Sequence, residues 1–462
     1  MVKSTRLYPM VTIGAPARAA VNQAGLVTVV ETIRATGLDR LLTEGLAKWD
    51  LPRATHKTGK VLLDLALAVI AGGDQLADAG LVRGQPDVFG QVASEPVVSR
   101  TIARLAGQID QVERQVAQVV AEARQTAWRL AGDASPVVAT PRAPLVIDID
   151  ATLVQAHSDK EGATGTWKHT FGFHPLCAFI DYKNNGGEPA GIMLRPGRAG
   201  SNTAKDHTDL AAKALLGLPA PLHGCQARDR VLIRTDSAGA THKFVNWLAG
   251  RKSQYSIGFT IPWEQAERVD WIPPEAWTPA YDDDGGVKPG AFVAEATGVI
   301  EVNGWPKDMR IILRKERPHP GAQLTLMDWD GNRVTAFITN TRTGQLPDLE
   351  LRHRQRAHCE DRVRCGKQVG LAKMPLQGFA QNRIWCLVVQ LANTLIGWMQ
   401  LIGCDGLAAR RWEPKRLRAR LFSTAGQLVR HARQTCLRFA RHTWTDTLTA
   451  IITRLRGVVL VT

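Results

Sequence analysis

The chain of 462 residues is long enough for several domains, and a hydrophobic share of 44% predicts a globular protein rather than a disordered one. Its seven cysteines are odd in number and form no C-x-x-C pair, which argues against a disulfide framework and a zinc ribbon. The formal net charge of +15 comes from residues 351–462, which hold 20 Lys and Arg but only 5 Asp and Glu. This basic segment predicts a polyanionic partner, nucleic acid before anionic membrane.

Residues 1–140 are predicted to form a helical domain. Ser94 is a suitable N-cap for a helix that carries Pro96 in its first turn. Arg100 and Arg104 follow on its polar side, and the pattern resembles the recognition helix of a helix-turn-helix, which makes both arginines candidate DNA contacts. A helix of an ordinary small bundle would show the same pattern.

Two acids lie in the first strand predicted for residues 141–262. Residues 145–149 are mostly apolar and β-branched, yet Asp148 and Asp150 interrupt and end the run. Alternation places both carboxylates on one face of the strand. An unpaired carboxylate is costly to bury, so this face requires a polar cleft or a cation such as Mg²⁺. The alternative is a strand end with two solvated aspartates.

Asp236 ends the next strongly apolar strand, predicted over residues 231–236, and a turn of small residues follows it. An acid at the carboxyl end of a buried strand is typical of ligand-binding and catalytic positions in α/β sheets. Residues 263–345 differ in character and predict a mostly β insertion. The insertion contains five tryptophans: Trp263, Trp271, Trp277, Trp305 and Trp329.

The most specific pattern lies on a helix predicted over residues 349–370. At 100° per residue, Glu360 shares one face of this helix with His353, Arg356 and Lys367. An ordinary surface helix can carry charges at such spacing. The spacing Arg356-x3-Glu360-x6-Lys367 nevertheless resembles the Arg-Glu-Lys part of the Y-R-E-K signature of DDE transposases from bacterial insertion sequences.

The resemblance extends over residues 145–400. Asp150-Ala151-Thr152 resembles the first acidic motif of that family, and Asp236 resembles the second. Residues 195–202 and 378–385 are similar to segments of one branch of these enzymes. The sequence departs from the signature at the tyrosine position, which His353 occupies.

The resemblance implies an α/β fold with an RNase H-like mixed sheet flanked by helices. Residues 141–262 and 346–404 would form this catalytic core, interrupted by the β insertion at 263–345. A helical DNA-binding domain, residues 1–140, would precede it, and a basic helical region, residues 405–462, would follow. Arg416, Arg418 and Arg420 in that last region are expected to contact phosphates without sequence preference.

The family also implies the chemistry. Asp150, Asp236 and Glu360 would be catalytic and would hold two Mg²⁺ ions, with Mn²⁺ as a substitute, for two-metal phosphoryl transfer. Asp148 remains a rival to Asp150 as the first acid. DNA contacts are implied for His353, Arg356 and Lys367, and base stacking for the tryptophans of the insertion.

The implied function is that of a DNA transposase. It would bind the terminal inverted repeats of its insertion sequence as a homodimer, cleave the double-stranded DNA ends and join them to target DNA. Three alternatives stay open: a decayed transposase that only binds DNA, a metal-dependent nuclease without strand transfer, and a glycosidase with paired carboxylates.

A cytoplasmic, nucleoid-associated protein without a membrane partner is expected. Residues 1–10 contain no apolar signal core. Residues 384–403 are apolar enough for a membrane helix, but Gln390, Asn393 and Gln400 interrupt them, which favours a buried core helix.

Overall fold

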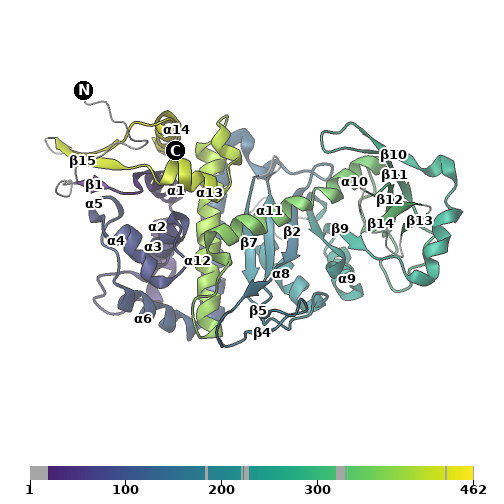
Figure 1. The fold of residues 1–462 in the computed structure, drawn as a ribbon, viewed down its shortest axis with the longest axis horizontal. Helices are drawn as coiled ribbons and strands as arrows, with labels where there is room; N and C mark the ends of the chain where they lie inside the picture. Colours follow the sequence, from purple (N-terminus) through teal and green to yellow (C-terminus); the bar gives the residue numbers. More distant parts are fainter. Residues whose placement is uncertain are drawn as a thin grey trace, which may run out of the picture.

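A computed structural model describes residues 19–182, 186–219, 222, 228–318, 328–329, 331–431 and 434–460. The molecule is elongated, with helices gathered at one end and β-strands at the other (Figure 1). The long helix α12 (Phe379–Trp398) stands between the two parts and packs against both, on α3 at one side and on strand β7 at the other.

The described residues up to 140 are mostly helical, as predicted. The helices are α1 (Val27–Thr36), α2 (Leu38–Gly45), α3 (Thr58–Ala71), α4 (Gly80–Arg83), α5 (Pro86–Phe89), α6 (Glu95–Ala106) and α7 (Ile109–Leu130). Every residue of α3 except Lys60 is buried, because this helix is apolar on nearly all sides and lies inside the bundle. Helices α3, α6 and α7 all contact α12.

One ten-stranded sheet forms the rest of the framework. Its order is β10-β11-β12-β14-β9-β8-β2-β6-β7, with β13 paired to β14. Strand β8 lies parallel to both β2 and β9, and the other pairs are antiparallel. The strands on the α12 side are β2 (Leu145–Ala151), β6 (Leu176–Asp181), β7 (Gly187–Met193), β8 (Val231–Thr235) and β9 (Gln254–Phe259). Helices α8 (Ala204–Leu216) and α9 (His242–Gly250) pack beside these strands.

The segment from residue 263 to 345 is mostly β, as expected, but it does not form a separate sheet. Its strands are β10 (Thr278–Tyr281), β11 (Val287–Glu295), β12 (Arg310–Glu316), β13 (Asp328–Trp329) and β14 (Asn332–Thr339). Strand β14 pairs with β9, with Ile338 opposite Ile257. The insertion therefore extends the central sheet by continuous backbone hydrogen bonding.

The expectation of an all-helical segment from 405 to 462 is wrong. Helix α13 (Pro414–Leu417) is followed by the hairpin of β15 (Gly426–His431) and β16 (Gln434–Phe439), which pairs with β1 (Ala20–Val21). Residues 426–431 and 434–439 mix apolar and polar side chains and are compatible with strands, and pairing with β1 gives the hairpin a third strand. Helix α14 (Thr445–Leu460) then packs on α1.

The segment Phe379–Gly403 is long and apolar enough to cross a membrane by length and composition. A bent pair, Thr58–Ala71 with Leu76–Arg83, is the other candidate among the described residues. In Phe379–Gly403 the most apolar window is 89% buried within the protein, in agreement with the predicted core helix.

Candidate active site

Asp150 and Asp236 lie at neighbouring strand ends. Strands β2 and β8 run parallel, with Ile149 in register with Thr235, so the next residue of each strand is an aspartate. The Asp236 carboxylate caps the following short helical turn by accepting a hydrogen bond of 3.1 Å from the Ala238 amide. Chain direction and register therefore bring together two acids that lie 86 positions apart in the sequence.

The helix that carries Glu360 is interrupted, contrary to the expectation of one continuous helix. Helix α10 (Leu346–Arg354) ends, and α11 (Ala357–Gly366) begins, across a tight turn at Gln355 and Arg356. Three i→i−3 bonds shape the turn: the Arg356 amide donates to the His353 carbonyl, the His358 amide to Gln355 and the Cys359 amide to Arg356. Figure 1 shows α10 and α11 crossing the sheet from the insertion toward α12.

The Arg356 guanidinium lies between two of the three acids. One of its nitrogens is 3.7 Å from Asp150 and the other is 3.3 Å from Glu360. Glu360 is 65% exposed in its side chain, whereas Asp150 is 16% exposed. The break in the helix thus places a cation between an inner acid on the sheet and an outer acid on the helix.

Burial raises the pKa of Asp150 to about 6. Arg356 opposes this shift, while the charges of Asp236 and Glu360 add to it. Asp236 and Glu360 therefore both lie close enough to Asp150 to influence it electrostatically. Grouping negative charges in this way is unfavourable without a cation among them.

The donor types suit a hard divalent ion, since the three acids offer carboxylate oxygens alone. Across the described residues, no group of three or more His, Cys, Asp or Glu side chains converges closely enough to form a finished metal site. Glu360 instead pairs with Arg356, and its exposure leaves its side chain free of tight packing. The set fits a divalent ion in the chemistry of its oxygens, but Glu360 is turned toward the arginine and the three carboxylates do not converge.

Asp148 has different surroundings from Asp150. Its carboxylate forms a bidentate pair with Arg234 at 2.5 and 2.8 Å, and both side chains are almost completely buried. Arg234 also reaches Asp181 at 3.1 Å. Burial alone would lower the pKa of Arg234, but the two carboxylates raise it. Asp148 is thus neutralised inside the sheet, while Asp150 faces Arg356.

Comparison with known proteins identifies the family. Residues 4–459 match the family model described as transposase DDE domain group 1. The chain belongs to the DDE transposases. Members of this family generally use divalent metal ions to cut and join DNA.

Other comparisons add little. No curated protein sequence matches the chain. Among solved structures it is similar to the piggyBac transposase synaptic complex with hairpin DNA, with 10% identity over 86% of this chain and 79% of that chain. The TM-score of 0.41 is too low to support an argument.

His353 occupies the position where the transposase signature has tyrosine. Its ring stacks on Phe337 of β14, with centroids 4.4 Å apart and planes 6° from parallel. Its Nδ1 lies 2.9 Å from the Ser256 hydroxyl of β9. Burial, together with the charges of neighbouring arginines, lowers the pKa of His353 to about 3. The imidazole is thus a neutral link between helix α10 and the sheet, and a DNA contact by His353 stays a prediction.

Lys367 begins the π-helical turn Lys367–Leu371 after α11. Burial lowers its pKa, and the neighbouring Cys177, which lies opposite Asp150 in the register of β6 with β2, opposes this shift. Lys367 therefore lies on the same side of the sheet as the acids.

The two arginines of α6 differ in their surroundings. Arg100 is exposed, whereas Arg104 donates a hydrogen bond of 2.8 Å to the Trp49 carbonyl. The opposite face of α6 is buried by Val98, Ile102 and Leu105, in a bundle that includes α12. Arg100 is the more accessible of these two predicted DNA contacts.

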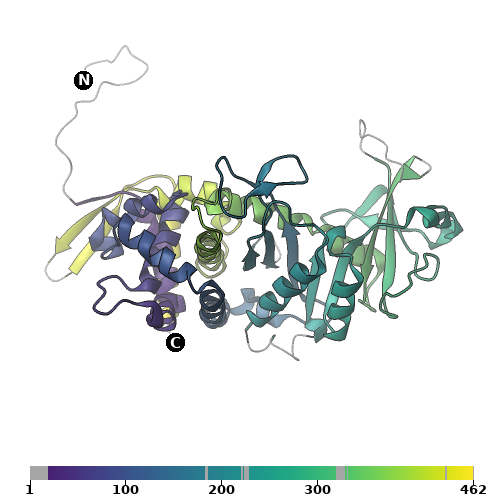
Figure 2. The ribbon, with the colours of Figure 1, turned by 90° about the horizontal axis from the view of Figure 1, so that it is seen from below.

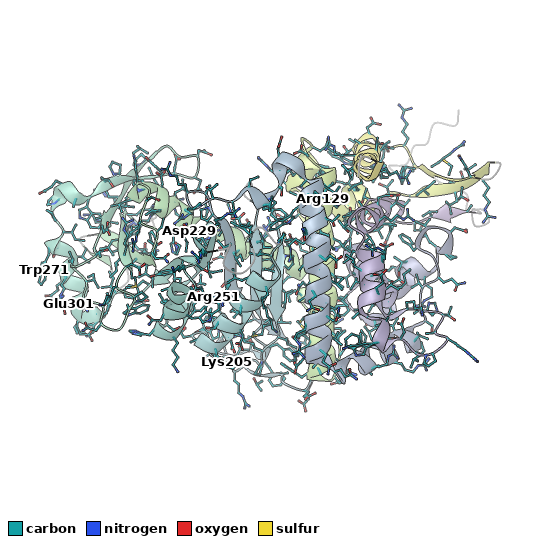
Figure 3. All side chains as sticks on the ribbon, turned by 180° about the vertical axis from the view of Figure 1, so that it is seen from behind. Arg129, Lys205, Asp229, Arg251, Trp271 and Glu301 are labelled. Atoms are coloured by element: carbon teal, nitrogen blue, oxygen red, sulfur yellow. The ribbon has the colours of Figure 1, made fainter. Side chains whose placement is uncertain are left out.

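The tryptophans of the insertion fall into two groups. Trp263 and Trp271 are 79% and 67% exposed, and Figure 3 shows Trp271 at the outer end of the molecule. Trp305 packs against Phe259 and His242, and Trp277 is partly buried with Lys315 over its ring. The side chain of Trp329 lies outside the described residues.

Sequence reasoning missed the arginine that supports the site. Arg234 interrupts the apolar run of β8 and stands in register with Asp148 of β2. A single charged residue within each of two buried strands can be recognised from the sequence, because a buried charge requires a partner of opposite charge. A second missed residue is His207 of α8, which is buried and lies near enough to Asp236 for their charges to interact.

Proposed function

We propose that this transposase cleaves the ends of its insertion sequence and joins them to target DNA with Asp150, Asp236 and Glu360 as its catalytic acids. The observation that supports the proposal is that Asp150 and Asp236 follow each other's register at the neighbouring ends of β2 and β8, while Arg356 contacts both Asp150 and Glu360. Each acid comes from a motif that resembles the family's, and each contributes to the charge around Asp150. The strands β7-β6-β2-β8-β9 would then be the RNase H-like core.

The acidic and basic side chains of the protein have different roles in this proposal. The carboxylates of Asp150 and Asp236 are held by the sheet, one in β2 and one at the cap after β8. Two Mg²⁺ ions, or Mn²⁺ in their place, would activate the attacking oxygen and stabilise the leaving oxygen when bound. Arg356 can donate two hydrogen bonds to a phosphate, and Lys367 can offer a point charge beside it.

The rest of the chain would bind and pair the DNA. Arg100 on α6 is a candidate for contact with the terminal inverted repeats, and the basic C-terminal region for contact with phosphates. A homodimer would hold two paired ends, and the protein would act in the cytoplasm on the nucleoid. These assignments rest on the family and on surface charge.

The test compares the parent protein with Asp236→Asn and Glu360→Gln. Each substitution keeps the side-chain shape and removes one negative charge. We expect cleavage of terminal-repeat DNA in Mg²⁺ to fall by about 100-fold or more in both variants, with DNA binding retained. Thermal unfolding with and without Mn²⁺ gives a second readout, and the increase in Tm should shrink in both variants.

Asp361→Asn is the matched control, because Asp361 pairs with Arg364 on the exposed side of α11. It should cleave and respond to Mn²⁺ like the parent. Normal cleavage by Glu360→Gln would remove Glu360 from the catalytic set. Cleavage without joining by the parent would favour a nuclease, and binding without cleavage would favour a decayed transposase.

A further inference from the structure

A short hairpin follows the first catalytic strand. Strand β4 (Thr164–Gly165) and strand β5 (Phe171–Phe173) pair with each other, and β5 also pairs with β3 (Val154–Gln155). The hairpin closes through a bond of 3.0 Å from the His169 amide to the Thr166 carbonyl, and His169 has a φ of 58°. A turn followed by a left-handed residue is a standard three-residue hairpin connection. Trp167 and Lys168 occupy its two central positions.

The hairpin is held firmly at its base. A Cβ on Gly197 would lie 2.3 Å from the Thr164 carbonyl, so only glycine permits this close approach of the 195–202 loop. The Arg198 amide also donates to the Thr164 hydroxyl at 2.8 Å. The loop that resembles one branch of the family thus acts as a support for the hairpin, and the turn is fixed in place.

The tip presents an aromatic ring and a positive charge to solvent. Trp167 is 66% exposed, and the Lys168 ammonium lies 4.9 Å from the centre of its ring. Phe171 on the same hairpin is 43% exposed. An indole that remains mostly in water contributes little to folding, so the core does not explain a tryptophan at this turn.

The base of the hairpin adjoins the strand that carries the first catalytic acid. The charge of Lys168 acts on Lys367, which in turn lies near Cys177, the register partner of Asp150. The small sheet also follows β2 directly, and the Thr152 amide bonds to the Pro175 carbonyl. Figure 1 shows β4 and β5 at the edge of the central sheet near one end of α12.

We propose that Trp167 stacks on a nucleobase of the DNA strand held at the catalytic acids, with the Lys168 and Lys367 ammonium groups at the flanking phosphates. The inference rests on the proposed function and adds a base-positioning residue outside the β insertion. Stacking suits this place because every base offers a ring face, whereas the end sequence can be read elsewhere. The Lys168 ammonium at the ring, and Lys367 near Lys168, favour a polyanion over an apolar protein partner.

The experiment uses the full chain and a terminal-repeat duplex that carries 2-aminopurine at successive positions around the cleavage site. The variants are Trp167→Ala and Trp167→Tyr, with Leu216→Ala as control, since Leu216 is a 61% exposed residue at the end of α8. We expect the parent to change the fluorescence of one or two positions and Trp167→Ala to lose that change. Affinity should fall about tenfold in Trp167→Ala, or about 1.4 kcal/mol, and recover in Trp167→Tyr.

The outcomes separate this inference from the proposed function. Equal fluorescence profiles and equal affinities for the parent and Trp167→Ala, with normal cleavage by the parent, would overturn the stacking role alone. A parent that does not cleave in Mg²⁺ would overturn the proposed function, whatever the fluorescence shows. Equal losses in Trp167→Ala and Leu216→Ala would also contradict a specific stacking contact.

Discussion

Asp148 and Asp150 lie two positions apart in one strand but differ in what neutralises them. Arg234 binds Asp148 with two hydrogen bonds inside the sheet, and Arg356 approaches Asp150 from outside it. A buried carboxylate that already has a bidentate partner is poorly placed to hold a metal ion, because the arginine would have to be displaced. The contacts of these two side chains therefore support Asp150 as the first catalytic acid.

His353 should make the stability of the protein depend on pH. Its pKa is about 3 in the folded protein, below the ordinary value of 6.5, so the unfolded chain binds the proton more readily. Stability from this residue is therefore complete above pH 6.5 and is lost as the pH falls toward 3. Between pH 7 and pH 5 we expect His353 to account for a loss of about 1–2 kcal/mol.

Urea unfolding at both pH values measures this effect. His353→Phe keeps a ring against Phe337 and should lose less stability on acidification than the parent. His157→Phe is the control, since His157 is exposed. The same loss in His353→Phe as in the parent would mean that other groups cause the acid sensitivity.

At the scale of elements, the approach of β9 to the end of β8 depends on Gly258. A Cβ at this position would lie 2.8 Å from the Ser237 amide nitrogen and 3.0 Å from the Asp236 carbonyl carbon. Because both neighbours are backbone atoms, Gly258→Ala must move the turn that carries Asp236. We expect cleavage to fall about 10- to 100-fold in a single-turnover assay, since small displacements of reacting groups are costly.

Gly250→Ala is the matched control, because no atom lies within 4 Å of the added carbon at the end of α9. It should leave cleavage unchanged. DNA binding should survive in both variants. Full activity of Gly258→Ala would show that the Asp236 turn tolerates displacement.

The three arginines predicted to contact phosphates in the basic C-terminal region differ in their surroundings. Arg416 is exposed, and its DNA contact stays a prediction, whereas Arg418 and Arg420 are engaged within the fold. Arg418 donates to the Ile70 and Gln368 carbonyls, each at 3.0 Å, and Arg420 lies over the rings of Trp412 and Trp444. Both arginines therefore support the fold. Figure 2 shows the β15–β16 hairpin extending at the helical end of the molecule. Among its described residues Arg430 and Arg438 are exposed arginines, and Arg441 is exposed nearby.

Replacing these three exposed arginines by glutamine should make DNA binding less sensitive to salt. The plot of log affinity against log salt should lose about 0.9 in slope for each phosphate contact removed. Sequence preference should not change, because phosphates carry no base information. Arg129→Gln on the exposed end of α7 serves as control (Figure 3). An unchanged slope in the triple variant would place the hairpin outside the DNA interface.

At the scale of the whole molecule, the helical end and the sheet share one buried polar centre. Glu188 of β7 accepts hydrogen bonds of 2.9 Å from Trp128 of α7 and from Trp398 of α12. Arg124 of α7 lies 3.0 Å from the same carboxylate, and both charged side chains are buried. Removal of residues 1–140 would expose this centre and one side of α12, so the N-terminal helices are part of the folded unit and not a detachable domain.

Glu188→Gln should therefore destabilise the entire chain. The substitution leaves the Arg124 guanidinium buried without its counter-charge, and we expect a loss of about 3–5 kcal/mol in the free energy of unfolding. Urea unfolding followed by circular dichroism measures it. Glu122→Gln, on the exposed side of the same helix, should change stability by less than about 1 kcal/mol. Similar small effects in both variants would argue against a shared structural centre.

The sequence alone was enough to predict the family, the strands that end at Asp150 and Asp236, and the three acids as candidates. These features depend on local periodicity and on short motifs, which can be recognised in the sequence without the fold. It also predicted the apolar segment around α12 as a core helix, because polar residues interrupt it. It did not determine the C-terminal hairpin, since a basic segment with mixed apolar residues is compatible with either a helix or a hairpin.

The surroundings of the acids depend on tertiary contacts. The distinction between Asp148 and Asp150 depends on Arg234 from a parallel strand, and the position of Arg356 depends on a break between α10 and α11 that helical periodicity does not reveal. The joining of the insertion to the core sheet and the packing of both chain ends around α12 are likewise long-range contacts. Such contacts form between residues distant in sequence, so no local pattern encodes them.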